Sequence, residues 1–220
     1  MTEELPPFAY HKEGKIEGLS VEIVNAILEN LEIKNTITIF PWARAYHEIL
    51  KNPNHVLFSM SRNNEREYSF QWVGPIIEDK VYFYSHVNDK NKISTIEDAK
   101  KVKTVIVSRG FPEHKLLQDK GFNNLSLVVS PAQGFKRIIS KRGDLMPAGE
   151  LTILPTDKRL KINGLLLQNT GVQLFSHSLY IAMSLNTPRA DVEKWQQALD
   201  QIKADGTYQK ILAKYLLNQL

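Results

Sequence analysis

The most informative part of this 220-residue chain reads Ser59-Met60-Ser61-Arg62-Asn63-Asn64-Glu65-Arg66-Glu67-Tyr68-Ser69-Phe70. Hydroxyls at alternate positions, Ser59 and Ser61, leave a predicted strand on the same side, and Arg66 can return over them. A guanidinium with neighbouring hydroxyls and backbone amides forms a planar, bidentate receptor for a carboxylate. The alternative is an ordinary surface loop in which the arginines pair with the neighbouring glutamates.

Helices and strands alternate around this stretch. Apolar residues recur every three or four positions in the predicted helices, whereas residues 36–40 alternate with a period of two. Ser20 is placed to cap the first helix. The predicted elements up to residue 85 are helices 19–31 and 42–50 and strands 36–40, 55–59 and 80–85.

The same alternation begins again further along the chain. Pro112 suits the first turn of a helix, and Gly206 can end a late helix as a left-handed cap. Alternating strands and helices predict α/β layers with mainly parallel pairing. The predicted strands are 104–107, 125–129, a short one after residue 144, and 179–183; the predicted helices are 95–100, one after Pro112, 132–140, 192–202 and 208–216.

Composition and patterning exclude several classes of function. The net charge is +4, but basic residues are interleaved with acids and no basic run carries spaced aromatics, so we expect no nucleic acid partner. The chain has no cysteine, no Gly-x-Ser-x-Gly elbow and no two histidines four residues apart. We therefore expect no covalent catalysis, no metal and no cofactor.

The chain also lacks the sequence features of membrane insertion and export. No stretch approaches the roughly 18 apolar residues of a membrane span, and the N-terminus has neither the basic nor the apolar region of a secretory signal. We expect a soluble chain that is either cytosolic or already freed of its signal. The absence of cysteine is compatible with the periplasm.

Three aromatic residues are candidates for stacking on a ligand. Phe8 and Tyr10 follow the rigid segment Pro6-Pro7 and lie outside any periodic element, so binding is favoured over packing. Trp42 lies on a predicted helix, where a place in the core is the stronger interpretation.

Two later positions can hold charged groups. Ser108-Arg109-Gly110 follows a strand and precedes a helix, so its amides and the helix dipole can hold an anion, although the nucleotide-binding glycine patterns are missing. Glu150 follows a short strand and can reach an amine; the alternative is a glutamate that simply favours a helix N-terminus.

Six short segments are individually weak signals, but their order along the chain is characteristic of one protein family. They are Pro6-Pro7-Phe8-Ala9-Tyr10, residues 14–23, residues 59–66, residues 70–75, Arg142-Gly143-Asp144, and residues 204–208. Together they resemble family 3 of the bacterial extracellular solute-binding proteins, the polar amino acid receptors of ABC importers. The resemblance implies an α/β, two-lobed periplasmic binding protein-like fold of type II. Two crossing hinge strands, near 84–87 and 175–179, would join lobe 1 (1–85 and 178–220) to lobe 2 (86–177), with ligand closing the lobes.

The resemblance also implies roles for single residues. Ser59 and Ser61 fall on the hydroxyl and amide positions of the family pocket, and Arg66 falls on its carboxylate-binding arginine. Phe8 or Tyr10 matches the stacking aromatic, and Gly110 matches the start of the second-lobe helix that grips the same carboxylate.

The sequence departs from the family pattern at two places in the predicted second lobe. Phe111-Pro112 replaces small hydroxyl residues, and Gly149 falls where an aspartate is expected for the ligand amine, with Glu150 one place off. Arg44 and Arg109 can serve a second acidic group.

The expected function is therefore that of a periplasmic, monomeric solute-binding protein. It would deliver a small polar, carboxylate-bearing ligand, such as an amino acid, to an ABC permease of the inner membrane. The alternatives are a sensory input domain, a clamp without ligand affinity, and, ranked lower, a dehydratase-like enzyme that uses Glu150.

Overall fold

The computed structural model describes residues 1–153 and 166–216 of the chain. Their contacts divide the protein into two compact units. Unit 1 comprises Met1–Glu78 and His177–Leu220, and unit 2 comprises Asp79–Ser176. Each unit is described by itself.

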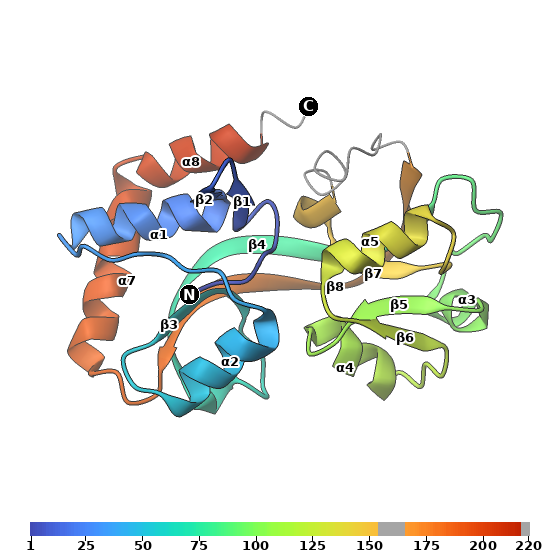
Figure 1. Cartoon of the computed structure of the whole chain (residues 1–220), viewed down its shortest axis with the longest axis horizontal. Helices are drawn as coiled ribbons and strands as arrows, with labels where there is room; N and C mark the ends of the chain where they lie inside the picture. Colours follow the sequence, from blue (N-terminus) through green and yellow to red (C-terminus); the bar gives the residue numbers. More distant parts are fainter. Residues whose placement is uncertain (154–165, 217–220) are drawn as a thin grey trace. The chain divides into compact units, whose positions relative to one another are not determined.

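The described part of unit 1 contains helices from both ends of the chain, which Figure 1 shows in blue and red-orange. They are α1 (Leu19–Asn30), α2 (Trp42–Lys51), α7 (Arg189–Ala204) and α8 (Thr207–Leu216). Apolar residues of α1 at helical spacing, such as Ile23 and Ile27, are fully buried, and α1 packs against both α7 and α8. These helices confirm the helical periods predicted from the sequence.

The start of α1 differs from the prediction. The N-cap residue is Gly18, and Ser20 lies inside the first turn, so Ser20 does not cap the helix. Gly18 is required because its φ is 141° and a Cβ there would lie 2.3 Å from the Phe8 carbonyl oxygen. That oxygen instead accepts the Ser20 amide at 3.0 Å, which fixes Pro6-Pro7-Phe8 against the helix start.

The short strands of unit 1 are antiparallel. Strand β1 (Tyr10–Lys12) pairs with β2 (Lys15–Glu17), and β3 (Val56–Ser61) pairs with the end of β8 (Leu167–Ser184). A bulge interrupts the β3–β8 register between Phe58 and Met60, so Ser59 stands out of the regular ladder.

The predicted strand at 36–40 is wrong. Its alternating pattern forms only one isolated bridge, between Thr2 and Ile39. The N-terminal residues supply the whole partner edge: the amide of Thr2 donates to Thr38, and the amide of Phe40 donates to Thr2. One bridging residue is too little to extend a ladder.

Two long strands run from one unit into the other. Strand β4 (Phe70–His86) follows a single 3-10 turn, η1 (Glu67–Ser69), and passes from unit 1 to unit 2 after residue 78. Strand β8 returns to unit 1 at His177. The strand order of this sheet is β3-β8-β4-β7. The lobe limits drawn from the sequence, at 85/86 and 177/178, stay a prediction.

In the part that the structure describes, unit 2 combines a small parallel sheet with helices packed around it. Strands β5 (Val105–Ser108) and β6 (Leu125–Val128) are parallel, and β7 (Met146–Gly149) pairs with β4. The helices are α3 (Ile96–Lys101), α4 (Pro112–Asp119) and α5 (Pro131–Ile139). Helix α5 packs on β5 and β7 (Figure 1). Ile106, Phe135 and Ile138 are buried in the core between them.

The expectation of mainly parallel pairing is wrong for the strands that the structure describes. Among the described residues, β5–β6 is a parallel strand pair, whereas β1–β2, β3–β8 and β4–β7 are antiparallel. A parallel pair needs a crossover segment, and α4 supplies one between β5 and β6. The long strands β4 and β8 instead pair with strands that run in the opposite direction.

Candidate functional site

Ser59 is the most unusual serine of unit 1. It sits at the β3 bulge with φ 64°, a left-handed conformation that a residue with a Cβ adopts only at a cost. Its side chain is buried, and its hydroxyl has no hydrogen-bond partner among the described residues. A buried hydroxyl without a protein partner, held on strained backbone, is typical of a binding position.

Arg66 lies close to the second predicted serine. Its Nη1 donates to the carbonyl oxygen of Ser61 at 3.1 Å, and its amide donates to Asn63. Both Ser61 and Arg66 are buried, with 7% and 8% of their surface exposed. Burial lowers the pKa of the Arg66 guanidinium below its ordinary value, but an arginine with that starting value stays charged. The structure therefore holds one buried positive charge beside the end of β3.

Two aromatic rings of α2 support that charge. The Arg66 guanidinium carbon lies 5.0 Å from the centre of the Trp42 ring and 5.4 Å from that of Tyr46. Both distances are within the range of a cation–π contact. The two rings are one helical turn apart, with centroids 5.5 Å from each other. Trp42 is half-buried against the core and thus serves packing and arginine support together.

The aromatic contacts continue from Tyr46 to a second arginine. The ring of Tyr46 contacts Phe70, Phe70 contacts Trp72, and Trp72 contacts Tyr180. The centroids of these successive pairs are 5.7, 5.6 and 5.9 Å apart. Arg62 lies over Trp72 and Tyr180, and it forms a two-bond ion pair with Glu67. That pair raises the pKa of Arg62 and lowers that of Glu67. The alternative of arginines paired to neighbouring glutamates thus describes Arg62. Arg66 contacts Ser61 and the rings, and it also interacts electrostatically with Glu3 and Glu65.

Phe8 and Tyr10 have different surroundings. Phe8 is a core residue with 1% of its surface exposed. Tyr10 opens β1, is half-buried and interacts electrostatically with Lys214 and Tyr215 of α8. Of the two, only Tyr10 has ring surface to offer a ligand.

The anion position predicted in unit 2 lies at the end of β5. Ser108 is buried and its hydroxyl has no partner among the described residues, whereas Arg109 and Gly110 are exposed. Helix α4 begins directly afterwards, and its N-cap residue, Phe111, provides no side-chain cap. The N-terminal amides of α4 therefore lie near an uncommitted hydroxyl and a solvent-exposed guanidinium.

Asp79 occupies the space beside Gly149. A Cβ built on Gly149 would lie 2.0 Å from Asp79 Oδ2. The other carboxylate oxygen accepts the amides of Lys80 at 2.8 Å and Leu151 at 3.2 Å. Burial raises the pKa of Asp79 to about 6, and the charge of Glu150 adds to the rise. Glu150 itself is exposed at the start of the helical residues 150–153. The buried carboxylate at this place comes from β4.

A comparison with known families decides the class of the chain. Residues 1–218 match the model of the bacterial extracellular solute-binding proteins, family 3. The chain belongs to this family. The match confirms the resemblance inferred from the short segments.

Relatives of this solute-binding protein are similar over nearly its whole length. The probable amino-acid-binding protein YxeM of Bacillus subtilis (strain 168) is 22% identical over 219 residues, which cover 95% of this chain and 79% of YxeM. A histidine kinase sensor domain with similarity to periplasmic binding proteins superimposes with a TM-score of 0.89 at 17% identity, over 98% of this chain and 93% of that one. An ancestral arginine-binding protein bound to glutamine gives 0.86 at 23% identity, over 98% and 95%. These likenesses confirm the two-lobed periplasmic binding protein fold.

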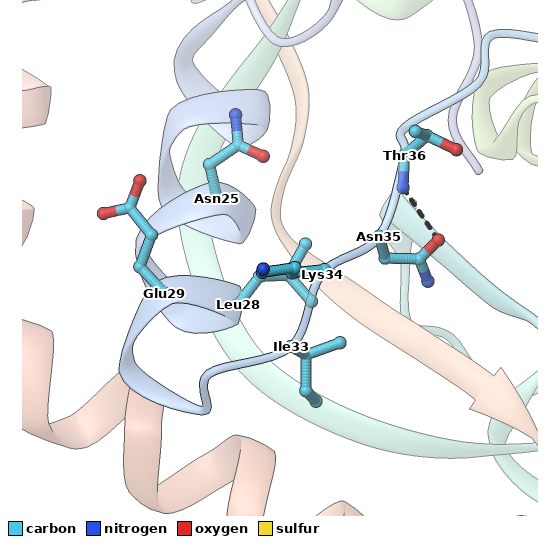
Figure 2. A pocket seen from close by; sticks show the side chains of 7 residues that line it. All are labelled: Asn25, Leu28, Glu29, Ile33, Lys34, Asn35 and Thr36. Atoms are coloured by element: carbon cyan, nitrogen blue, oxygen red, sulfur yellow. Dashed lines mark hydrogen bonds between the residues drawn. The ribbon is translucent and has the colours of Figure 1, made fainter.

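A surface hollow of unit 1 lies away from the predicted binding residues. Its volume is about 430 Å³, and Figure 2 shows it between the C-terminal half of α1 and the segment that follows. None of the predicted ligand-binding residues lines it; the lining residues are Asn25, Leu28, Glu29, Ile33, Lys34, Asn35 and Thr36. We assign it no role in ligand capture.

Several residues that the structure brings to these positions are not predictable from the sequence alone. Tyr46 was recognisable as the helical neighbour of Trp42, four positions on, but nothing linked it to Arg66. Asp79 and His177 carried no local signal, because each becomes notable only through a partner far along the chain, Leu151 and Ser61 respectively. Among the described residues, no cluster of potential metal ligands is found, and no helix there is both long and apolar enough to cross a membrane.

Proposed function

We propose that this family 3 protein captures an amino acid, or a close relative that bears a carboxylate, and delivers it to an ABC importer. The observation that carries the proposal is the group at the end of β3. Ser59 has an uncommitted, buried hydroxyl on strained backbone, and two residues further on, Ser61 is bound to a buried guanidinium. A fixed cation with adjacent hydroxyls matches a carboxylate better than a neutral or cationic group.

The names of relatives support the same ligand class. YxeM is a probable amino-acid-binding protein, and the ancestral arginine-binding protein is bound to glutamine. Every amino acid carries a carboxylate, so a common receptor for this group is compatible with different side-chain pockets. The side chain of the ligand would be selected elsewhere, with Tyr10 and Trp42 as aromatic candidates.

Residues of unit 2 would complete the recognition. Arg109 and the amides at Gly110 are suited to an anionic group of the ligand, and Glu150 is suited to an amine. In this proposal ligand binding stabilises a closed state of the two lobes, and the closed monomer docks on its permease outside the inner membrane.

A thermal unfolding screen tests this proposal. The native protein is melted with each of the twenty amino acids, with dicarboxylates and with polyamines. A ligand at roughly 100 times its dissociation constant stabilises the folded state by about 2.7 kcal/mol. We expect a shift from at least one carboxylate-bearing compound, none in Arg66→Ala measured against its own ligand-free melt, and a full shift in Arg62→Ala. A panel that shifts nothing in the native protein contradicts the proposal.

The likeness to a histidine kinase sensor domain favours a second candidate, a sensory role for the same clamp. The two roles differ in the partner and not in the ligand. Uptake of the identified ligand into vesicles that contain the permease requires the protein if it serves transport. Uptake without it, together with ligand-dependent binding to a kinase, would favour sensing. Transport and sensing are both functions of binding proteins. A dehydratase-like enzyme is the lower-ranked, enzymatic hypothesis.

A further inference from the structure

His177 contacts the hydroxyl of Ser61. Its Nδ1 lies 2.7 Å from Ser61 Oγ, a hydrogen-bond distance. The contact is built into the sheet, because Ser61 pairs with Leu179 of β8 and His177 lies two residues earlier on the same strand. Side chains two positions apart on a strand share a face, so the ring of His177 reaches forward along β8, towards Leu179, to contact the serine.

Ser61 is thereby fixed from two sides. Arg66 donates to its carbonyl oxygen, and His177 meets its hydroxyl. Burial lowers the pKa of His177 to about 4, so the ring is neutral near pH 7, with one nitrogen protonated and the other an acceptor. The direction of the hydrogen bond depends on which nitrogen carries the proton.

The direction matters because a serine has one proton. If Ser61 donates to Nδ1, its oxygen has only acceptor capacity left and repels a carboxylate, which is itself an acceptor. If Nδ1–H donates to Ser61 Oγ, the serine proton is available for a ligand oxygen. A carboxylate that is bound by the Ser61 hydroxyl needs the second arrangement.

We propose that His177 is a positioning residue for carboxylate capture. Its Nδ1–H donates to Ser61 Oγ and directs the single serine proton to the ligand carboxylate. This inference rests on the proposed function, and it adds a residue on β8 to the groups of β3 and the following turn. It also assigns a specificity: the serine proton favours a carboxylate over the carboxamide of the same shape, because a hydrogen bond to a charged oxygen is stronger than one to a neutral oxygen.

Imidazole nitrogen NMR tests the tautomer directly. The probes are sodium acetate, the simplest carboxylate, and acetamide, its neutral isostere. With acetate saturating, we expect the Nδ1 of His177 to show the shift of a protonated ring nitrogen and Nε2 that of an unprotonated one. The opposite tautomer, or an absence of any acetate response at Ser61 and His177, overturns the inference.

Variants separate positioning from packing. In His177→Phe, which fills the space without a nitrogen, we expect the acetate dissociation constant to rise about tenfold and that of acetamide to rise less, because its oxygen is neutral. His177→Asn retains a donor near Nδ1 and should stay within about threefold of the native value. The double variant Ser61→Ala/His177→Phe should bind acetate no more weakly than Ser61→Ala alone.

Equal acetate binding by the native protein and His177→Phe overturns the inference, as does an additive double variant. If His177→Phe does not fold, His177→Asn, Ser61→Ala and the tautomer measurement still decide. Failure of the inference differs from failure of the proposed function. In the first case an amino acid still stabilises the native protein while His177 proves irrelevant; in the second no amino acid stabilises it.

Discussion

The candidate binding residues of unit 1 and those of unit 2 are held in opposite ways. Ser59, Ser61 and Arg66 are all buried, and Arg66 is fixed by Ser61 and two aromatic rings. In unit 2, Arg109 and Glu150 are exposed to solvent. The candidate residues of unit 1 are packed into the core of that unit, whereas Arg109 and Glu150 of unit 2 extend into solvent from the ends of strands.

This difference separates binding energy from folding energy. A group ordered by its own fold loses little further entropy when ligand arrives, whereas an exposed side chain must be both ordered and desolvated at that moment. Substitutions in the unit 1 set should therefore change stability and affinity together. Substitutions in the unit 2 set should change affinity alone.

The largest contrast is expected between two arginines. Arg66→Ala removes a charged hydrogen bond and two ring contacts from a buried site, and we expect it to lower the free energy of unfolding by about 3 to 4 kcal/mol. Arg109→Ala should stay within about 0.5 kcal/mol of the native value, because surface substitutions away from special contacts rarely exceed that. Urea unfolding of both variants provides the measurement. Similar losses for the two would remove the distinction between the units.

Most of the fold was predictable from local pattern. The period of apolar residues placed α1, α2, α5 and α7 within a few positions, because each helix buries one face of its own sequence. The prediction of a strand at 36–40 was wrong because strand pairing depends on a partner edge that no local pattern reveals. The prediction of mainly parallel pairing was wrong for the same reason, because the antiparallel partners of β4 and β8 are far away in the sequence.

The site was predictable where a motif is contiguous. Ser59, Ser61 and Arg66 lie within eight residues, so one strand and one turn bring them near each other. The support of Arg66 by Tyr46, of Ser61 by His177, and the place of Asp79 beside Gly149 join residues 20 to 116 positions apart in the sequence. Such contacts are properties of the folded chain, and a single sequence carries no signal for them.

The pH dependence of stability probes the buried carboxylate of unit 2. The raised pKa of Asp79, about 6, means that the folded state holds its proton more tightly than the unfolded state. This group therefore lowers the free energy of unfolding as pH rises from about 4 to above 6, by about 3 kcal/mol in all. In Asp79→Asn this loss should vanish. The free energy of unfolding of the variant should therefore rise relative to that of the native protein between pH 4 and pH 7.

Two comparisons isolate the Asp79 contribution in the same urea titrations. His177 acts in the opposite sense, since its lowered pKa makes the folded state gain stability as pH rises from about 4 towards its unfolded value. Only the difference between native and variant therefore reports on Asp79. Glu150→Gln, at an exposed carboxylate nearby, should retain most of the native slope. A difference between native and Asp79→Asn that stays constant with pH would refute the assignment.

A smaller effect is expected at Gly149. Gly149→Ala places a methyl group against Asp79 Oδ2, whose carboxylate is held by the Leu151 amide and has little room to retreat. We expect a loss of about 2 kcal/mol, typical of overpacking. The loss should shrink in Gly149→Ala/Asp79→Ala relative to the sum of the single variants. The φ of Gly149 lies outside the left-handed region, so the clash with Asp79, and not backbone strain, accounts for the expected loss. Additive losses would show that the two residues do not compete for space.

The smallest change in stability should accompany a clear change in binding. Ser59→Gly relieves a left-handed backbone and removes a buried hydroxyl without a described partner, so we expect a gain of about 0.5 kcal/mol after the entropy of the added glycine is subtracted. Ligand affinity should fall, because the hydroxyl is held for the carboxylate. Ser20→Ala is the matched control: its hydroxyl is also buried without a described partner, but it lies in α1, so its loss should leave affinity unchanged. Thermal melts with and without the amino acid identified by screening measure both quantities. Unchanged affinity in Ser59→Gly would mean that unit 1 binds its ligand through Ser61 and Arg66 alone, and that the strain at Ser59 serves the bulge of β3 and not the site.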